Sequence, residues 1–356
     1  TYFDDDELMQ TVKAHGAMMA DSLQPLVDRH PLVNLTGKGM ILGLDVGNGD
    51  RAKQIVSQCF ESGLMIASCG TGGRVVKLIP PLTTPKADLE EGLKILIKAT
   101  DNVMIEEYER RLRELRERIA ERRMDAVVIS DPENIMYLTD YQTTGYSFFQ
   151  ALVVPLEDEP FMITRKLEES NITARTWVEI TRPYPDTGDA IQMLVDALRE
   201  FGLDKKRIGY ERNSYFFPAY HQDCIHNTLT DGKLLDCFGI VEEGRVCKSP
   251  VEIAIMQNAT RATEAGMQAG IDATEAGVTE NEIGAAISSA MFKAGGEPPA
   301  VMPYVTSGPR TMIGHATWEG RVVEPGEHVF LEVAGCYRRY HTAMMRTVVL
   351  GKLSPS

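Results

Sequence analysis

Hydrophobic and polar positions along the chain follow two alternating periods, one typical of helices and one typical of strands. In residues 51–62 and 88–103, apolar side chains recur every three to four positions, which predicts amphipathic helices. Residues 35–46 alternate like a strand that follows a glycine turn. Residues 63–68 are expected to form a strand directly after the helix of residues 51–62. Helix and strand therefore alternate up to about residue 103, which predicts a small α/β layer structure.

The pattern changes at Met104, where a strongly charged helix begins with Glu and Arg at helical spacing. Short apolar runs follow, and a helical pattern lies among them. These features predict a mixed sheet flanked by helices. The expected strands are residues 125–130, 149–155, 160–166 and 178–184, and the expected helix is residues 189–202.

Residues 248–296 read as two helices joined by a Gly-Val-Thr-Glu turn. Ser249 and Glu252 have the spacing of a capping box, and Pro250 suits the first helical position. Further on, residues 330–347 alternate like two strands of a hairpin joined across residues 337–339. The last part of the chain is therefore expected to be of the α+β class.

Composition and charge exclude some functions. The 356 residues, 43% of them hydrophobic, are enough for two or three domains. The net charge of -14 argues against a nucleic-acid partner. No apolar run approaches the roughly 18 residues of a membrane span, and the amino end lacks the pattern of a signal peptide, so no membrane partner and a cytoplasmic location are expected. The six cysteines are scattered without a C-x-x-C pair and are expected to be buried thiols.

The first part of the chain carries a family resemblance. The stretches "GKGMILGLDV", "VVKLIPPLTT" and "LEEGLKIL" resemble the C-terminal small domain of class III pyridoxal-phosphate aminotransferases. The resemblance implies a substrate-binding role for Lys77, which occupies a position where many members have an arginine and is similar to the diaminobutyrate-type branch. The alternative is a solvated charge at a strand end. The lysine that binds the cofactor belongs to the large domain of that family, so pyridoxal phosphate is expected only in the parent enzyme.

The remainder resembles a different family, that of creatinase and aminopeptidase P. The resemblance is carried by "DPENIMYLTDY", "KSPVEIAIMQNA", "TSGPRTMIGHA" and "VVEPGEHVFLEVAGCYRRYHTAMMRT". It implies an N-terminal α/β domain and the first half of a pita-bread catalytic domain, here truncated at its C-terminal end. The expected fold is therefore multidomain, of α/β and α+β classes, with an aminotransferase small domain at 1–103, a creatinase-like domain at 104–246 and a truncated pita-bread domain at 247–356.

Metal-dependent members of this second family place two aspartates on the hairpin, eleven residues apart, to hold two metal ions. The resemblance puts Glu332 at the first position and Ala343 at the second. Because alanine has no ligand atom, we predict no metal and no other cofactor for the hydrolase part, as in the metal-free creatinase branch. The alternative left open is a metal-dependent Xaa-Pro dipeptidase.

The same resemblance implies the active-site residues. His315 falls at the position of an active-site histidine, and its imidazole can exchange protons near neutral pH. Glu332 is expected to orient water or substrate. Candidate substrate-binding residues, each with a structural alternative in the core, on the surface or in an ion pair, are Tyr146, Phe148, Phe149, His341 and Arg346.

These observations predict a metal-independent hydrolase that cleaves a C–N bond in a small polar metabolite. A diaminobutyrate-type transaminase segment beside a creatinase-like segment favours ectoine as the substrate. The family implies a homodimer when the protein is intact. The competing hypothesis is an inactive fusion fragment related to an aminotransferase.

Overall fold

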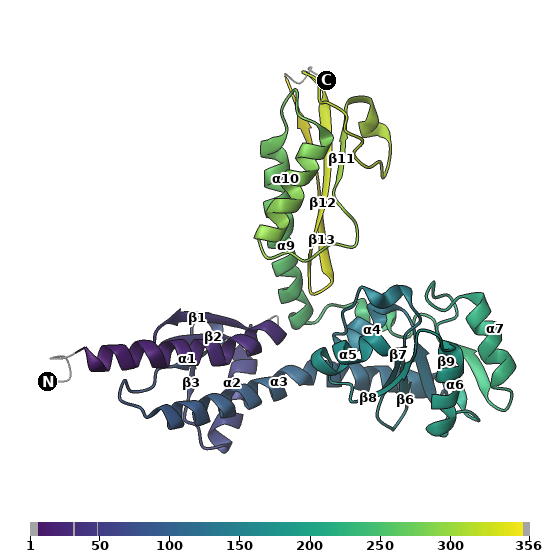
Figure 1. The fold of residues 1–356 in the computed structure, drawn as a ribbon, viewed down its shortest axis with the longest axis horizontal. Helices are drawn as coiled ribbons and strands as arrows, with labels where there is room; N and C mark the ends of the chain where they lie inside the picture. Colours follow the sequence, from purple (N-terminus) through teal and green to yellow (C-terminus); the bar gives the residue numbers. More distant parts are fainter. Residues whose placement is uncertain (1–5, 31–32, 48, 352–356) are drawn as a thin grey trace. The chain divides into compact units, whose positions relative to one another are not determined.

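The computed structural model describes residues 6–30, 33–47 and 49–351. The chain divides into two compact units, one formed by Thr1–Ile95 with Lys248–Ser356 and the other by Leu96–Cys247. Helices and sheets occur in both units (Figure 1), so the predicted mixture of α/β and α+β architecture is confirmed. Within the described residues, every helix falls short of the length and apolarity needed to cross a membrane.

The amino-terminal segment of the first unit is built around a four-stranded antiparallel sheet with the strand order β1-β2-β4-β3. Residues 35–46 form two strands rather than the single strand predicted, because Gly37 and Gly39 adopt positive φ angles of 109° and 60° and the chain turns there. The elements are α1 (Glu7–Arg29), β1 (Asn34–Lys38), β2 (Ile41–Asp45), α2 (Gly49–Glu61), β3 (Ala67–Cys69), the short η1 (Thr71–Gly73) and β4 (Val75–Leu78).

A single helix, α3 (Lys86–Glu121), replaces the two helices expected around Met104. The sequence offers no glycine or proline between residues 93 and 121, so nothing in the backbone chemistry ends a helix there. The predicted boundary at residues 103 and 104 therefore lies inside continuous helix.

The second unit contains a six-stranded mixed sheet with the order β10-β9-β5-β6-β7-β8. Strands β9, β5 and β10 run parallel to one another, as do β7 and β8, whereas β6 is antiparallel to both of its neighbours. The strands are β5 (Ala126–Ile129), β6 (Ala151–Pro155), β7 (Phe161–Arg165), β8 (Ile180–Tyr184), β9 (Arg207–Tyr210) and β10 (Lys233–Asp236). The helical elements are α4 (Pro132–Thr139), η2 (Gly145–Ser147), η3 (Lys166–Glu168), α5 (Glu169–Arg175), α6 (Ala190–Glu200), α7 (Ala219–Thr228) and α8 (Glu242–Arg245).

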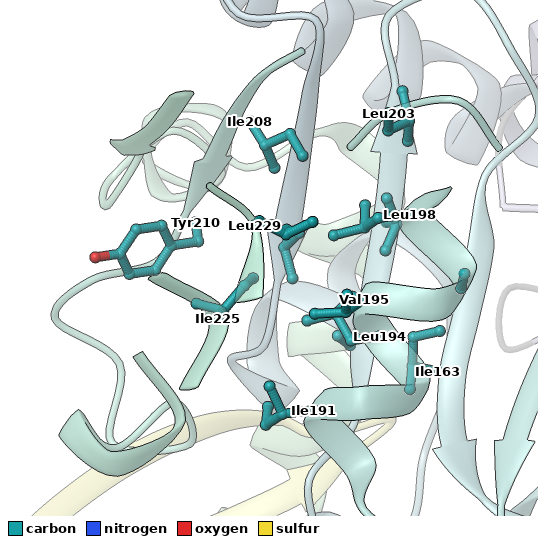
Figure 2. Close-up of a cluster of buried hydrophobic side chains, with 14 of the residues drawn as sticks. Ile163, Ile191, Leu194, Val195, Leu198, Leu203, Ile208, Tyr210, Ile225 and Leu229 are labelled. Atoms are coloured by element: carbon teal, nitrogen blue, oxygen red, sulfur yellow. The ribbon is translucent and has the colours of Figure 1, made fainter. Parts of the chain in front are cut away.

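Both faces of this sheet are covered by hydrophobic side chains. All four residues of β5 are buried, as expected for a central strand. Figure 2 shows the core on one face, where Leu194 and Leu198 of α6 lie near Ile208 of β9 and Ile225 of α7. A second cluster, which includes Leu115 and Ile119 of α3, packs on the other face.

The carboxyl-terminal segment packs two helices against a three-stranded antiparallel sheet of order β11-β12-β13. Its elements are α9 (Pro250–Ala273), α10 (Glu280–Lys293), β11 (Tyr304–Ser307), η4 (Gly308–Met312), β12 (His328–Tyr337) and β13 (Tyr340–Val349). The predicted capping box of Ser249 and Glu252 is present, with Pro250 in the first turn. The predicted hairpin is also present, and its two-residue turn places Arg338 and Arg339 at positive φ angles.

The cysteines are free and are not all buried as predicted. Cys59, Cys237 and Cys336 are buried, Cys69 and Cys224 are half-buried, and Cys247 is exposed. The exposed thiol lies at the last residue of the second unit.

Candidate functional site

One face of the β11-β12-β13 sheet carries Glu332 and His341, two of the residues that the sequence places in an active site. Tyr304 on β11 is paired with Glu332 on β12, and Glu332 is paired with Met345 on β13. Ala334 and Ala343 form the next pair on the same face, because directly opposed residues of a sheet share a face and alternate residues along a strand do too. The two positions singled out on the hairpin, Glu332 and Ala343, are therefore diagonal neighbours on one surface.

His315 lies at the edge of this surface, in the loop that follows η4. Its ring stacks on the ring of Tyr304, with 5.7 Å between the centroids and 25° between the planes. The backbone of His315 has a φ of 57°, a left-handed conformation that few residues other than glycine adopt. The imidazole of His315 thus stacks on the ring of Tyr304, and Glu332 is the residue paired with Tyr304 on the neighbouring strand.

Both chemically active groups are available to a ligand. Within the described residues, the side chains of His315 and Glu332 make no hydrogen bond and no ion pair, and His315 is exposed. An imidazole with unoccupied nitrogens can transfer protons, and a carboxylate with unoccupied oxygens can bind a water or a cationic substrate group. This part of the protein therefore offers an imidazole and a carboxylate that are both unengaged among the described residues.

His341 lies on the same face but is already engaged. Its Nδ1–H donates to the carbonyl of Arg339 at 3.0 Å, and its Nε2 accepts from the amide of Ala300 at 3.0 Å. Burial and the charge of Arg339 lower the pKa of His341, so the ring is held neutral with both nitrogens occupied. A role in substrate binding stays a prediction, and it would require the ring to exchange one of these partners.

Arg346 lies on the opposite face of the hairpin from Glu332, because its register partner is Leu331. Its guanidinium is exposed and donates to the carbonyl of Met345 at 2.7 Å. Lys77 is an exposed side chain of β4 in the amino-terminal segment, paired with Gly43 and Ala67. Contacts of Arg346 and Lys77 with a substrate stay predictions.

The three aromatic candidates belong to the second unit. Tyr146 and Phe148 are exposed, and the guanidinium of Arg165 lies over the Phe148 ring at 4.1 Å. Phe149 is only 8% exposed and packs into the hydrophobic core against Phe217, which agrees with the core alternative considered for it. Tyr146 and Phe148 therefore remain the better placed candidates for contact with a ligand.

A cluster of three carboxylates, which the sequence analysis missed, lies in the second unit at the ends of two parallel strands. Ligand oxygens of Asp131, Glu211 and Glu242 all lie within 4.8 Å of one another. Glu211 is fully buried, and burial raises its pKa to about 7. The signal was available, because Asp131 follows β5 and Glu211 follows β9, and the carboxyl ends of neighbouring parallel strands meet at one edge of a sheet.

The donors around Glu211 limit what this cluster can bind. One carboxylate oxygen of Glu211 accepts from the amides of Ser130 at 2.5 Å and Asp131 at 2.8 Å, and the other accepts from Nδ2 of Asn134 at 2.5 Å. Oxygen ligands close together suit a hard divalent cation. A cation bound here would compete with these hydrogen bonds for the lone pairs of Glu211.

The hairpin face by itself does not fit a two-metal centre. Glu332 is the one carboxylate among the described residues on β11, β12 and β13, and its neighbours Ala334, Ala343 and Met345 offer no hard oxygen ligand from their side chains. Two ions that share a site need several such ligands. The described hairpin thus supplies one of the ligands such a centre requires.

Comparisons with known proteins place each segment in a family. Residues 111–247 match the creatinase/prolidase N-terminal domain, and residues 254–356 match the metallopeptidase family M24. Residues 1–100 match the class-III aminotransferases. These matches confirm the two resemblances read from the sequence.

Individual relatives give the same division. The chain is 31% identical to the ectoine hydrolase of Halomonas elongata over 268 residues, which is 69% of this chain and 66% of the relative. It is 52% identical over 64 residues to the diaminobutyrate–2-oxoglutarate transaminase of the same organism, covering 18% of this chain and 15% of the relative. The chain thus spans 66% of the length of the hydrolase relative.

Solved structures share the fold. An X-Pro aminopeptidase from Thermotoga maritima superposes with a TM-score of 0.61 at 23% identity, covering 68% of this chain and 66% of the other. A Xaa-Pro dipeptidase from Bacillus anthracis gives a TM-score of 0.60 at 20% identity, covering 69% and 66% of the two chains.

The prediction that the hydrolase part uses no metal was wrong. It rested on the two hairpin positions, Glu332 and Ala343, whereas the family matched by residues 254–356 is one of metallopeptidases, and the described residues contain a carboxylate cluster able to hold a cation. The absence of a ligand atom at one position does not determine whether the whole enzyme binds a metal.

The relatives that match 68% to 69% of the chain carry the names of hydrolases and peptidases. The chain is thus similar to the creatinase/prolidase N-terminal domain at residues 111–247, to the metallopeptidase family M24 at residues 254–356 and to the class-III aminotransferases at residues 1–100.

Proposed function

We propose that the creatinase-like part of this chain hydrolyses a C–N bond in a small polar metabolite, with ectoine as the favoured substrate. The observation that carries the proposal is the relation of two unengaged side chains to Tyr304: the imidazole of His315 stacks on its ring, and Glu332 is its partner on the neighbouring strand. The identity of 31% to an ectoine hydrolase supports the choice of substrate.

The chemistry assigns one role to each group. Water adds to the carbon of an amidine or amide, and His315 takes the proton that the water releases. The C–N bond then breaks, and His315 returns the proton to the leaving nitrogen. The Glu332 carboxylate accepts a hydrogen bond from the water or from a cationic nitrogen of the substrate, which holds the reacting atoms in place. A metal ion, where bound, would supply Lewis acidity.

The domain limits and the surroundings of the site are part of the same proposal. The aminotransferase segment ends near residue 103, the creatinase-like domain near residue 246, and the catalytic segment follows from residue 247. Tyr146, Phe148 and His341 are proposed to contact substrate in the assembled protein. The proposed assembly is a homodimer located in the cytoplasm.

The test is hydrolysis of ectoine, creatine and a Gly-Pro dipeptide by the full chain, with added Mn²⁺ and after chelation. We expect turnover of ectoine, and a loss of about 100-fold or more in His315→Ala, the size of a general acid–base contribution. The variant His328→Ala serves as a matched control, because His328 is an exposed histidine at the start of β12 in the same segment of the chain. Hydrolysis of the Gly-Pro dipeptide with Mn²⁺ in place of ectoine would assign the chain to the dipeptidases, and no turnover of any substrate would contradict the proposal.

A further inference from the structure

A buried carboxylate lies behind the loop that carries His315. Glu280, at the first turn of α10, is fully buried, and such a charge is stable only when it is paired and hydrogen-bonded. Its Oε1 accepts from the amide and the hydroxyl of Ser307, both at 2.8 Å. Its Oε2 accepts from the guanidinium of Arg310 and from the amide of Glu319 at 3.1 Å. Glu280 therefore binds the loop at its start and again after His315.

Arg310 connects the same two parts of the loop from within. One end of its guanidinium pairs with Glu280, and the other donates to the carbonyl of Thr317 and pairs with Glu319 at 3.1 Å. The planar guanidinium has donors enough to hold all three partners at once. The side chain of Arg310 thus joins the two ends of the segment from Arg310 to Thr317. This segment contains His315.

The conformation of His315 needs such support. A left-handed φ at a residue other than glycine persists when the surroundings determine it. The Tyr304 ring contacts one face of the imidazole, and no hydrogen bond between described residues fixes its nitrogens. The constraint on the backbone therefore comes from the contacts at residues 307, 310, 317 and 319.

We propose that Glu280 and Arg310 are positioning residues for His315: the buried ion pair fixes the loop so that the imidazole lies on Tyr304 and faces the Glu332 surface. The catalytic part of this inference rests on the proposed function, whereas the positioning part does not.

The variant Arg310→Lys separates positioning from stability. A lysine ammonium is a compact charge that can still pair with Glu280, but it cannot also reach the Thr317 carbonyl as the planar fork does. The variant Arg310→Met removes both contacts. Arg182→Lys is the matched control, because the guanidinium of Arg182 also pairs with a glutamate, Glu200, and donates to a backbone carbonyl, that of Thr181, in the second unit.

The first readout is the imidazole signals of His315 in proton–carbon NMR spectra of the full chain, assigned by comparison with His315→Gln. We expect Arg310→Lys to shift these signals toward those of an unstacked histidine while its melting temperature stays closer to wild type than that of Arg310→Met. Arg182→Lys should leave the His315 signals in place. Unchanged His315 signals in Arg310→Lys would overturn the positioning role.

The second readout is the kinetics of ectoine hydrolysis. Loss of alignment should lower kcat by about 10- to 100-fold in Arg310→Lys with little change in KM. A change in KM alone, or equal kinetics in wild type and Arg310→Lys, would contradict the inference. If no substrate is turned over, the proposed function fails, and the NMR comparison still decides whether Arg310 positions His315.

Discussion

Tyr304 is directly opposite Glu332 across the β11-β12 pair, and its ring has the imidazole of His315 stacked on it. Tyr304 therefore contacts the candidate proton-transfer group, His315, and is paired with the candidate carboxylate, Glu332. We therefore expect the position of the His315 imidazole to depend on the ring of Tyr304 and not on its hydroxyl.

Replacing Tyr304 tests this dependence. In Tyr304→Ala the imidazole loses its stacking partner, and we expect kcat for the hydrolysis to fall about 10-fold or more because the reacting groups lose their alignment. Tyr304→Phe keeps the ring and should retain most of the wild-type kcat. Steady-state kinetics of the two variants check the prediction, and equal losses in both would show that the hydroxyl matters instead.

His341 should contribute to stability in a pH-dependent way. Its pKa is lowered in the folded protein, so the unfolded chain binds a proton more readily near pH 6.5. The stability that the neutral ring supplies is therefore present above pH 6.5 and is lost as the pH falls through the lower folded pKa. His341→Gln should cost about 1 kcal/mol at pH 8 through the lost hydrogen bonds and should flatten this part of the pH profile. Denaturant unfolding between pH 5 and 8 measures both effects, and a variant with the wild-type slope would refute the assignment.

Glu211 should act with the opposite sign. Its pKa is raised to about 7, so the folded protein holds a proton that the unfolded chain releases near pH 4.5. Stability from this group is complete below the unfolded pKa and is lost as the pH rises through about 7. We expect Glu211→Gln to remove this decline, whatever its absolute stability. Unfolding curves at several pH values test the prediction, with Glu243→Gln, an exposed glutamate of the same unit, as the control.

The hairpin lies close to the backbone of α9 at Gly335. A Cβ added there would lie 2.6 Å from the carbonyl oxygen of Ala259 and 2.6 Å from the amide of Thr263, both backbone atoms that cannot easily move. Gly335→Ala should therefore destabilise the protein by about 1–3 kcal/mol, as overpacking does. Gly314→Ala, where a Cβ meets open space, should leave the unfolding free energy close to wild type. Thermal unfolding of both variants decides, and a stable Gly335→Ala would contradict the close packing.

Ala343 offers a test of the hairpin as a metal site. An aspartate at this exposed position would lie on the same face as Glu332, so Ala343→Asp adds a second hard ligand. We expect it to raise the affinity of the chain for Mn²⁺ by about 10-fold, measured by calorimetry. Ala343→Asn, which adds no charge, should gain much less. No gain in Ala343→Asp would show that the two positions do not converge on one ion.

The sequence predicted local features better than long-range ones. The hairpin from His328 to Val349 and the cap at Ser249 follow from alternation and from short-range hydrogen bonding, and both are present. The split of residues 35–46 into two strands was missed because either glycine can continue a strand or turn it. Helix α3 was divided in the prediction although no residue ends it.

The candidate site was also predicted only in part, because local sequence patterns do not show contacts between distant residues. His315 and Glu332 were found from motifs, but Tyr304, Glu280 and Arg310 were not. The contact of Arg310 with Glu280 joins residues 30 positions apart, and no local pattern announces it. One of the two partners of the His341 ring, the amide of Ala300, likewise comes from a loop 41 positions away. Whether a polar side chain is free or engaged is a property of tertiary structure.

The exposure of Cys247 makes the protein open to selective labelling. Burial raises the pKa of the Cys59 and Cys336 thiols to about 11 and that of Cys237 well above its ordinary value, so these groups react slowly with electrophiles at neutral pH. Cys247 is the one exposed thiol among the six, and it lies where the two units meet in the sequence. A fluorophore or spin label attached there would mark the last residue of the second unit without any engineered residue.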